Sequence, residues 1–101
     1  MPIPKRNALA VEVAESLAIQ ALAFLAEEPG RLGRFLAITG VGPEGVRAAA
    51  REPGFLAGVL EYLSGDEPLL IEFAMQLSLD PADIARAGTV LGHATPERER
   101  P

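Results

Sequence analysis

Apolar side chains recur along this sequence with the period of an α-helix, and no run of β-branched residues alternates with polar ones as a half-buried strand would. Alanine and leucine dominate, whereas aromatic residues make up only 5 % of the chain. Both dominant residues have a high intrinsic helix propensity. The sequence therefore predicts an all-α fold.

Proline and glycine mark where the predicted helices end and begin. Pro29 stops the first helix, which Asn7 is placed to cap, and Gly40 and Gly42 separate the second helix from a third that starts at Pro43. Similar signals further along complete the set. They predict helices over about residues 7–28, 30–39, 43–52, 55–63, 66–77 and 81–91.

The connections between these helices are too short to separate domains. Residues 7–92 are therefore predicted to form a single domain, a compact orthogonal bundle of five to six short helices. Residues 1–6 are expected to fray, and residues 93–101, which lack apolar periodicity, are expected to be disordered.

The predicted core follows from the apolar spacing. The first helix carries an apolar arc over about half of its circumference, which is typical of a central helix or of one shared with a partner. Its arc consists of Val11, Val13, Leu17, Leu22, Phe24 and Leu25. The later helices are expected to bury Leu32, Phe35, Leu36, Phe55, Leu56, Val59, Leu60, Leu63, Leu70, Phe73, Ala74, Leu77, Ile84 and Leu91.

Charge is distributed unevenly along the chain, whose formal net charge is -5. Residues 31–51 hold four arginines and one acid, whereas residues 52–83 hold seven acids and no base. Such an asymmetry predicts a molecule with two electrically different sides. An acidic surface favours a basic partner.

The composition argues against several classes of function. No cysteine is present, which excludes a disulfide scaffold, a thiolate metal site and a cysteine nucleophile and favours a reducing, cytoplasmic location. His93 is the only histidine, and the acid pairs Asp66/Glu67 and Asp80/Asp83 occupy helix-capping positions where acids are expected anyway. We therefore expect no enzyme activity, no cofactor and no metal.

No membrane segment is predicted either. The longest charge-free stretch of the strongly apolar region lies between Glu15 and Glu27, which is short of the roughly 20 residues that cross a bilayer. The first residues also lack the apolar core of a signal peptide. The chain is expected to be soluble.

Residues 35–46 resemble a helix-hairpin-helix nucleic-acid-binding motif, whose centre is glycine, a hydrophobic residue and glycine. In that motif Gly40 and Gly42 would let backbone N–H groups approach a phosphate, and Arg47 and Arg51 would supply positive charge. Glu44 departs from the pattern, because a carboxylate in the first turn repels phosphate. An ordinary tight connection between two helices is the alternative interpretation.

Several segments are similar to a family of small uncharacterised bacterial proteins, classed as a domain of unknown function. The similarity covers about residues 17–91, and Leu32-Gly33-Arg34-Phe35-Leu36 is its most specific part. The other matching segments are residues 21–26, 39–40, 53–56, 59–60 and 79–81. The resemblance implies a bacterial, cytosolic, helical single-domain protein and implies no activity.

Surface recognition is the function that remains. We expect a small protein-interaction module that presents an acidic surface to a protein partner or self-associates through its first helix. Ile19, on the polar face of that helix, and Tyr62 are the candidate interface anchors. Weak, sequence-nonspecific nucleic-acid binding through Gly40, Gly42, Arg47 and Arg51 is the alternative.

Overall fold

The computed structural model describes residues 4–93 and shows helices throughout, with no strand in that range. The predicted all-α class is confirmed. The helices are α1 (Pro4–Ala26), α2 (Pro29–Thr39), α3 (Val46–Ala49), α4 (Pro53–Ser64), α5 (Glu67–Leu77) and α6 (Pro81–His93), with a single 3-10 turn, η1 (Pro43–Gly45), before α3.

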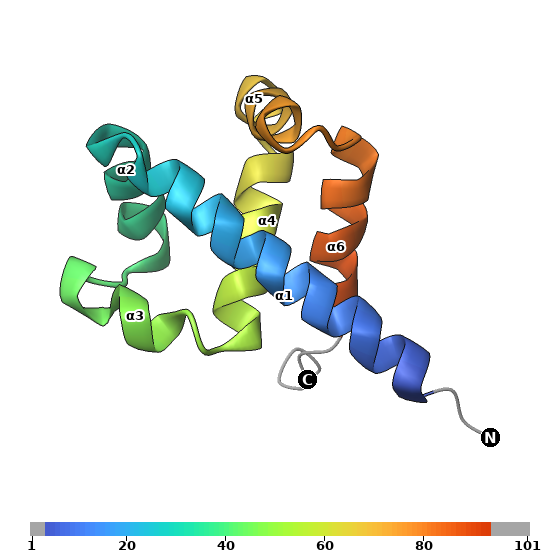
Figure 1. Cartoon of the computed structure of the whole chain (residues 1–101). Helices are drawn as coiled ribbons and strands as arrows, with labels where there is room; N and C mark the ends of the chain where they lie inside the picture. The colour runs from blue at the N-terminus through green and yellow to red at the C-terminus, as the bar shows by residue number, and fades with distance from the viewer. Residues whose placement is uncertain (1–3, 94–101) are drawn as a thin grey trace.

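The long helix α1 crosses the molecule and packs on α2, α4 and α6 (Figure 1). It runs across α4 and α6 rather than alongside them, while α2 and α3 lie at one end of the molecule and α6 at the other. Its buried residues include Ala18, Ala21 and Leu25, each fully shielded from solvent. The prediction that the first helix is central is correct.

Contacts between aromatic rings join α5 to α1 and α2 to α4. Phe24 of α1 meets Phe73 of α5 with ring centroids 5.1 Å apart. On the other side Phe35 of α2 contacts two rings of α4, Phe55 at 5.6 Å and Tyr62 at 5.2 Å. Tilted ring pairs at these separations add to the free energy gained by burial alone.

The α4–α6 pair is packed closely because Gly88 faces Leu60. A Cβ atom at Gly88 would lie 3.3 Å from the Cβ of Leu60, which is itself fully buried. Glycine at this position therefore lets the two backbones approach each other.

The predictions for the two ends of the chain concern residues 1–6 and 93–101. Part of each segment is helical, and the rest lies outside the described residues. Helix α1 starts at Pro4 rather than near Asn7, so residues 4–6 of the predicted frayed segment are helical. Proline fits this position because the first helical N–H needs no intrahelical partner. His93 closes α6 instead of opening the tail, and residues 1–3 and 94–101 lie outside the described part of the chain.

The third predicted helix is also shorter than expected. A helix over residues 43–52 was predicted, but only η1 and the four residues of α3 form there. Glu52 adopts φ -95° and ψ 123° because Pro53 disfavours a helical conformation in the residue before it. Glu28 and Gly42, which also precede prolines, are extended in the same way.

One predicted core position was wrong. Val13 was assigned to the buried arc of the first helix, yet 65 % of it is exposed, because the packed face of α1 is narrower than the apolar arc. On α5 the predicted Leu70 is half-buried and packs against the core, and Leu69, which was not predicted, is buried because it shares a face with Phe73 at i and i+4.

Local backbone geometry at the end of α5 positions the following residue. Ser78 adopts a left-handed conformation with φ 55° and donates its N–H to the carbonyl of Met75. Leu79 then donates its N–H to the carbonyl of Ala74 at 2.8 Å, which closes a Schellman-type helix end. This turn places Leu79 between α5 and α6.

Candidate functional site

A groove of about 960 Å³ opens between α1, the α5–α6 connection and α6. Helix α1 contributes one face to it, with Val13, Leu17 and Gln20 spaced so that they point the same way. The opposite wall consists of residues from the end of α5 and from α6. Together the lining residues are Ala10, Glu12, Val13, Ala14, Ser16, Leu17, Gln20, Leu77, Leu79, Asp83, Arg86, Ala87 and Val90.

The groove is predominantly apolar, and two of its large aliphatic lining residues are exposed. Val13 is 65 % exposed and Leu79 is 38 % exposed, although both are large aliphatic side chains. Leu17, by contrast, lies at the base of the groove and is buried. Exposed apolar side chains gathered in a concavity are typical of a binding surface.

Charged groups stand at the rim of the groove. Asp83 and Arg86, one turn apart on α6, form an ion pair with each other. Glu12 has no ion pair with any described side chain. The groove therefore keeps one uncompensated negative charge among its lining residues.

Two further exposed apolar side chains lie on α5, outside the lining of the groove. Ile71 and Met75, 42 % and 73 % exposed, are one turn apart on this helix, and Leu79 lies beyond its end, after the left-handed Ser78. We refer to Val13, Ile71, Met75 and Leu79 as the apolar band. Six large hydrophobic side chains are exposed in the described part of the chain, and the band includes four of them, the others being Ile19 and Ile38.

The two predicted interface anchors do not line this groove. Ile19 is 50 % exposed on α1 but is not one of the residues that line the groove. Tyr62 is half-buried, and its ring packs against Phe35 in the core. The sequence did not point to Val13 as a groove residue because its place in the apolar arc assigned it to the core. Ile71 and Met75 lie outside the predicted core of their helix, and nothing in the sequence singled them out as a surface.

Two backbone N–H groups of the glycine turn between α2 and α3 are hydrogen-bonded to the end of α2. Gly40 adopts a left-handed conformation, φ 80°, and its N–H is bonded to the carbonyl of Leu36 at 2.8 Å. The N–H of Val41 donates to the hydroxyl of Thr39 at 3.2 Å. These two amides are therefore engaged within the turn and are not free for a phosphate.

Glu44 further occupies the approach to this turn. Its side chain folds back over Gly42, where a Cβ atom would lie 2.9 Å from the Oε2 atom of Glu44. A phosphate placed beside Gly42 would meet this carboxylate, and like charges repel. The geometry thus favours a plain helix connection here, while nucleic-acid binding by Gly40, Gly42, Arg47 and Arg51 stays a prediction.

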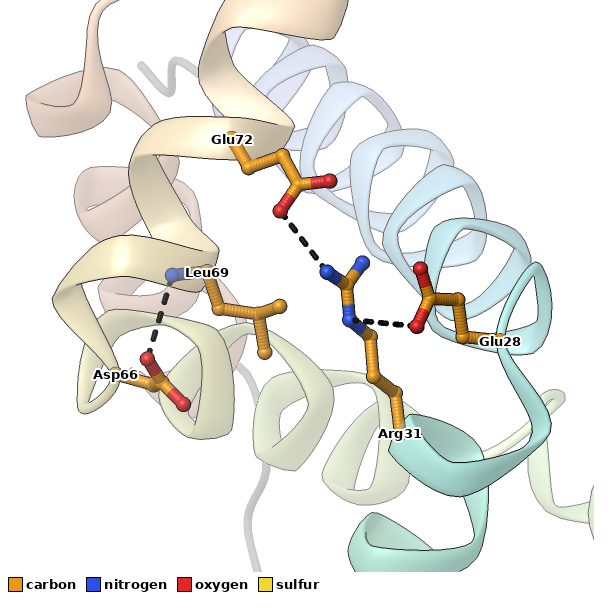
Figure 2. A network of polar contacts seen from close by, with 5 residues as sticks. All are labelled: Glu28, Arg31, Asp66, Leu69 and Glu72. Atoms are coloured by element: carbon orange, nitrogen blue, oxygen red, sulfur yellow. Dashed lines mark hydrogen bonds and ion pairs between the residues drawn. The ribbon is translucent and has the colours of Figure 1, made fainter.

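The arginines of residues 31–51 divide into two groups. Arg31 is 19 % exposed and lies between Glu72, 3.0 Å away, and Glu28, 3.8 Å away (Figure 2). Arg34, Arg47 and Arg51 are exposed and form no ion pair with a described side chain. Only one of the four is thus neutralised by the acidic half of the sequence.

The chain matches a known protein family over most of its length. The family described as a protein of unknown function, DUF3572, matches residues 11–94. The chain belongs to this family. The match covers every lining residue of the groove except Ala10, so the groove is formed by the family domain itself.

No curated protein and no solved structure matches the chain. Among residues 10–92, whose side chains the structure describes, no three or more acidic residues are arranged to hold a metal ion. None of the described helices combines the length and the hydropathy that a membrane crossing requires.

Proposed function

We propose that this chain is a small, non-catalytic protein-interaction module whose groove receives the apolar ridge of a helix from a partner protein. The observation that carries the proposal is the gathering of exposed apolar side chains, Val13 and Leu79 above all, around one groove. Grooves of this kind are commonly filled by an amphipathic helix, which inserts side chains spaced at i, i+3, i+4 and i+7.

The dimensions of the groove agree with such a partner. Along α1 its lining extends from Ala10 to Gln20, a helical length of about 15 Å. A partner helix of about three turns would cover this length. The walls come from two helices that are held together by the core, so the groove needs no large rearrangement before binding.

The polar groups of the groove are better suited to recognition than to catalysis. Its ionisable residues are Glu12, Asp83 and Arg86, and the last two are bound to each other. A general acid–base mechanism needs positioned groups that can exchange protons with a substrate, and Glu12 on the open rim has no such companion. The proposal includes a cytoplasmic location, which rests on the cysteine-free sequence.

Site-specific photo-crosslinking in the native cell tests the proposal. A photoreactive residue is introduced at Val13, inside the groove, and in a second variant at Ile38 of α2, which is equally exposed but does not line the groove. We expect one or more proteins to be captured at Val13 and not at Ile38. The captured protein is then purified, and its affinity for the full chain is measured.

The binding measurement uses matched substitutions. Val13→Asp should weaken binding of the purified partner by about tenfold, because burial of a valine side chain contributes about 1.5 kcal/mol or more and aspartate cannot replace it. Ile38→Asp should leave the affinity unchanged. The same proteins at both crosslinking positions, or equal affinity of the two variants, would overturn the proposal.

A further inference from the structure

We propose that the helix received by the groove is basic along the flanks of its apolar ridge and belongs to a different protein rather than to a second copy of this chain. This inference rests on the proposed function and adds the chemistry of the partner. It is carried by the charges that surround the apolar band.

Three carboxylates without an ion pair to a described residue frame the band. Glu12 precedes Val13 and lines the groove, Asp80 follows Leu79, and Glu67 lies one helical turn before Ile71. All three are exposed. Positive charges flanking a partner's apolar side chains would each find a carboxylate here.

Among the residues whose side chains the structure describes, the bases near the band are paired with acids. Arg86 is paired with Asp83 on the rim of the groove, and Arg31 is paired with Glu72 next to Ile71. No base occurs between Glu52 and Asp83, so the whole of α5 and its two connections carry acids alone. An acidic partner helix would meet repulsion over the entire band, whereas a basic one is attracted to it.

The same charges disfavour a second copy as the occupant. In a two-fold symmetric pair the apolar band of one copy would face the apolar band of the other copy, or the carboxylates around that band. With a net charge of -5 per chain, such a contact would bring like-charged carboxylates together without arginines to separate them. The predicted self-association through the first helix would not use this surface.

Synthetic peptides test the inference directly. Three peptides of about 18 residues have the same leucine ridge at helical spacing, with flanking positions filled by lysine, glutamine or glutamate. Their affinities for the full chain are measured by fluorescence anisotropy at low and at physiological salt. We expect the lysine peptide to bind at least about tenfold more tightly than the glutamine peptide, the glutamate peptide not to bind, and the preference for lysine to shrink as salt rises.

Val13→Asp separates groove binding from general attraction between opposite charges. This substitution adds a negative charge, so a peptide held by charge alone would bind more tightly, whereas a peptide seated in the groove should bind about tenfold more weakly. Ile38→Asp adds the same charge away from the groove and should not weaken binding. Val13→Ser, which is uncharged, should weaken binding in the same direction, and circular dichroism confirms that all three variants fold.

Each other outcome has a defined meaning. Equal affinity for the lysine and glutamine peptides, with both sensitive to Val13→Asp, would overturn the basic partner and leave the proposed function in place. Tighter binding of the lysine peptide to Val13→Asp, or no binding of any peptide, would overturn the inference, while the crosslinking experiment at Val13 still decides the proposed function. A dimer in sedimentation that Val13→Asp dissociates would show that the groove takes a second copy.

Discussion

The guanidinium of Arg31 lies 3.0 Å from a carboxylate oxygen of Glu72, although the two residues are 41 positions apart in the sequence. The same guanidinium stands over the ring of Phe24, 5.2 Å from its centroid, and Phe24 in turn contacts Phe73. Helix α5 is thus joined to the start of α2 by the ion pair of Arg31 and Glu72, which Figure 2 shows, and to the end of α1 by the ring contact of Phe24 and Phe73. Because the last residues of α5 form a wall of the groove, this junction positions the candidate site.

Replacement of Arg31 by methionine is expected to lower the free energy of unfolding by about 1 kcal/mol. Methionine keeps much of the aliphatic stem but loses the ion pair and the cation–π contact. The ion pair contributes little stability because the Glu72 side chain is half exposed, and a single cation–π contact is also a small contribution. Urea unfolding followed by circular dichroism measures the change. Arg34→Met is the matched control, since Arg34 is exposed without an ion pair among the described residues, and an equal loss in both variants would contradict the proposed role of Arg31.

Substitutions of two helical glycines should have opposite effects. Gly88→Val should destabilise the protein by about 2–3 kcal/mol, because the added atoms collide with Leu60 in the α4–α6 contact. Gly33→Ala on the exposed face of α2 meets nothing within 4 Å and should stabilise by about 0.5–1 kcal/mol through helix propensity. Thermal unfolding of the two variants checks both signs, and a tolerated Gly88→Val would mean that the two helices are less closely packed than described.

Ser78→Gly is expected to stabilise the protein by about 0.5–1 kcal/mol. Serine at φ 55° has its Cβ close to the following carbonyl, a cost that glycine does not have. Ser64→Gly serves as control, because Ser64 ends α4 in a right-handed helical conformation and glycine there should cost about 0.5 kcal/mol. Denaturant midpoints of the two variants should therefore move in opposite directions.

Binding to nucleic acid is expected to be below detection even at low ionic strength. Glu44 covers Gly42, two amides of the turn are already bonded, and the net charge is -5. A duplex DNA of arbitrary sequence, titrated in an electrophoretic mobility assay, provides the measurement. Salt-sensitive binding that disappears in Arg47→Glu would instead favour the helix-hairpin-helix interpretation of residues 35–46.

The sequence by itself determined the helical class, the number of helices and most of their boundaries. These properties are local. Periodic leucines and phenylalanines select a buried face, and Pro29, Pro43 and Pro53 each begin an element because proline fits the first turn and forces an extended residue before it. The predicted N-cap Asp66 accepts the N–H of Leu69, a contact that spans only three residues.

Only the tertiary structure decided which apolar residues stay exposed and where the acids lie in relation to them. Val13 belongs to the apolar arc of α1 on a helical wheel, but whether it is covered depends on how far α6 and the α5–α6 connection extend over that arc. The pairing of Arg31 with Glu72 likewise depends on the distance between α2 and α5. Periodicity identifies a face that can be buried, whereas the packing of distant helices determines how much of that face remains for a partner.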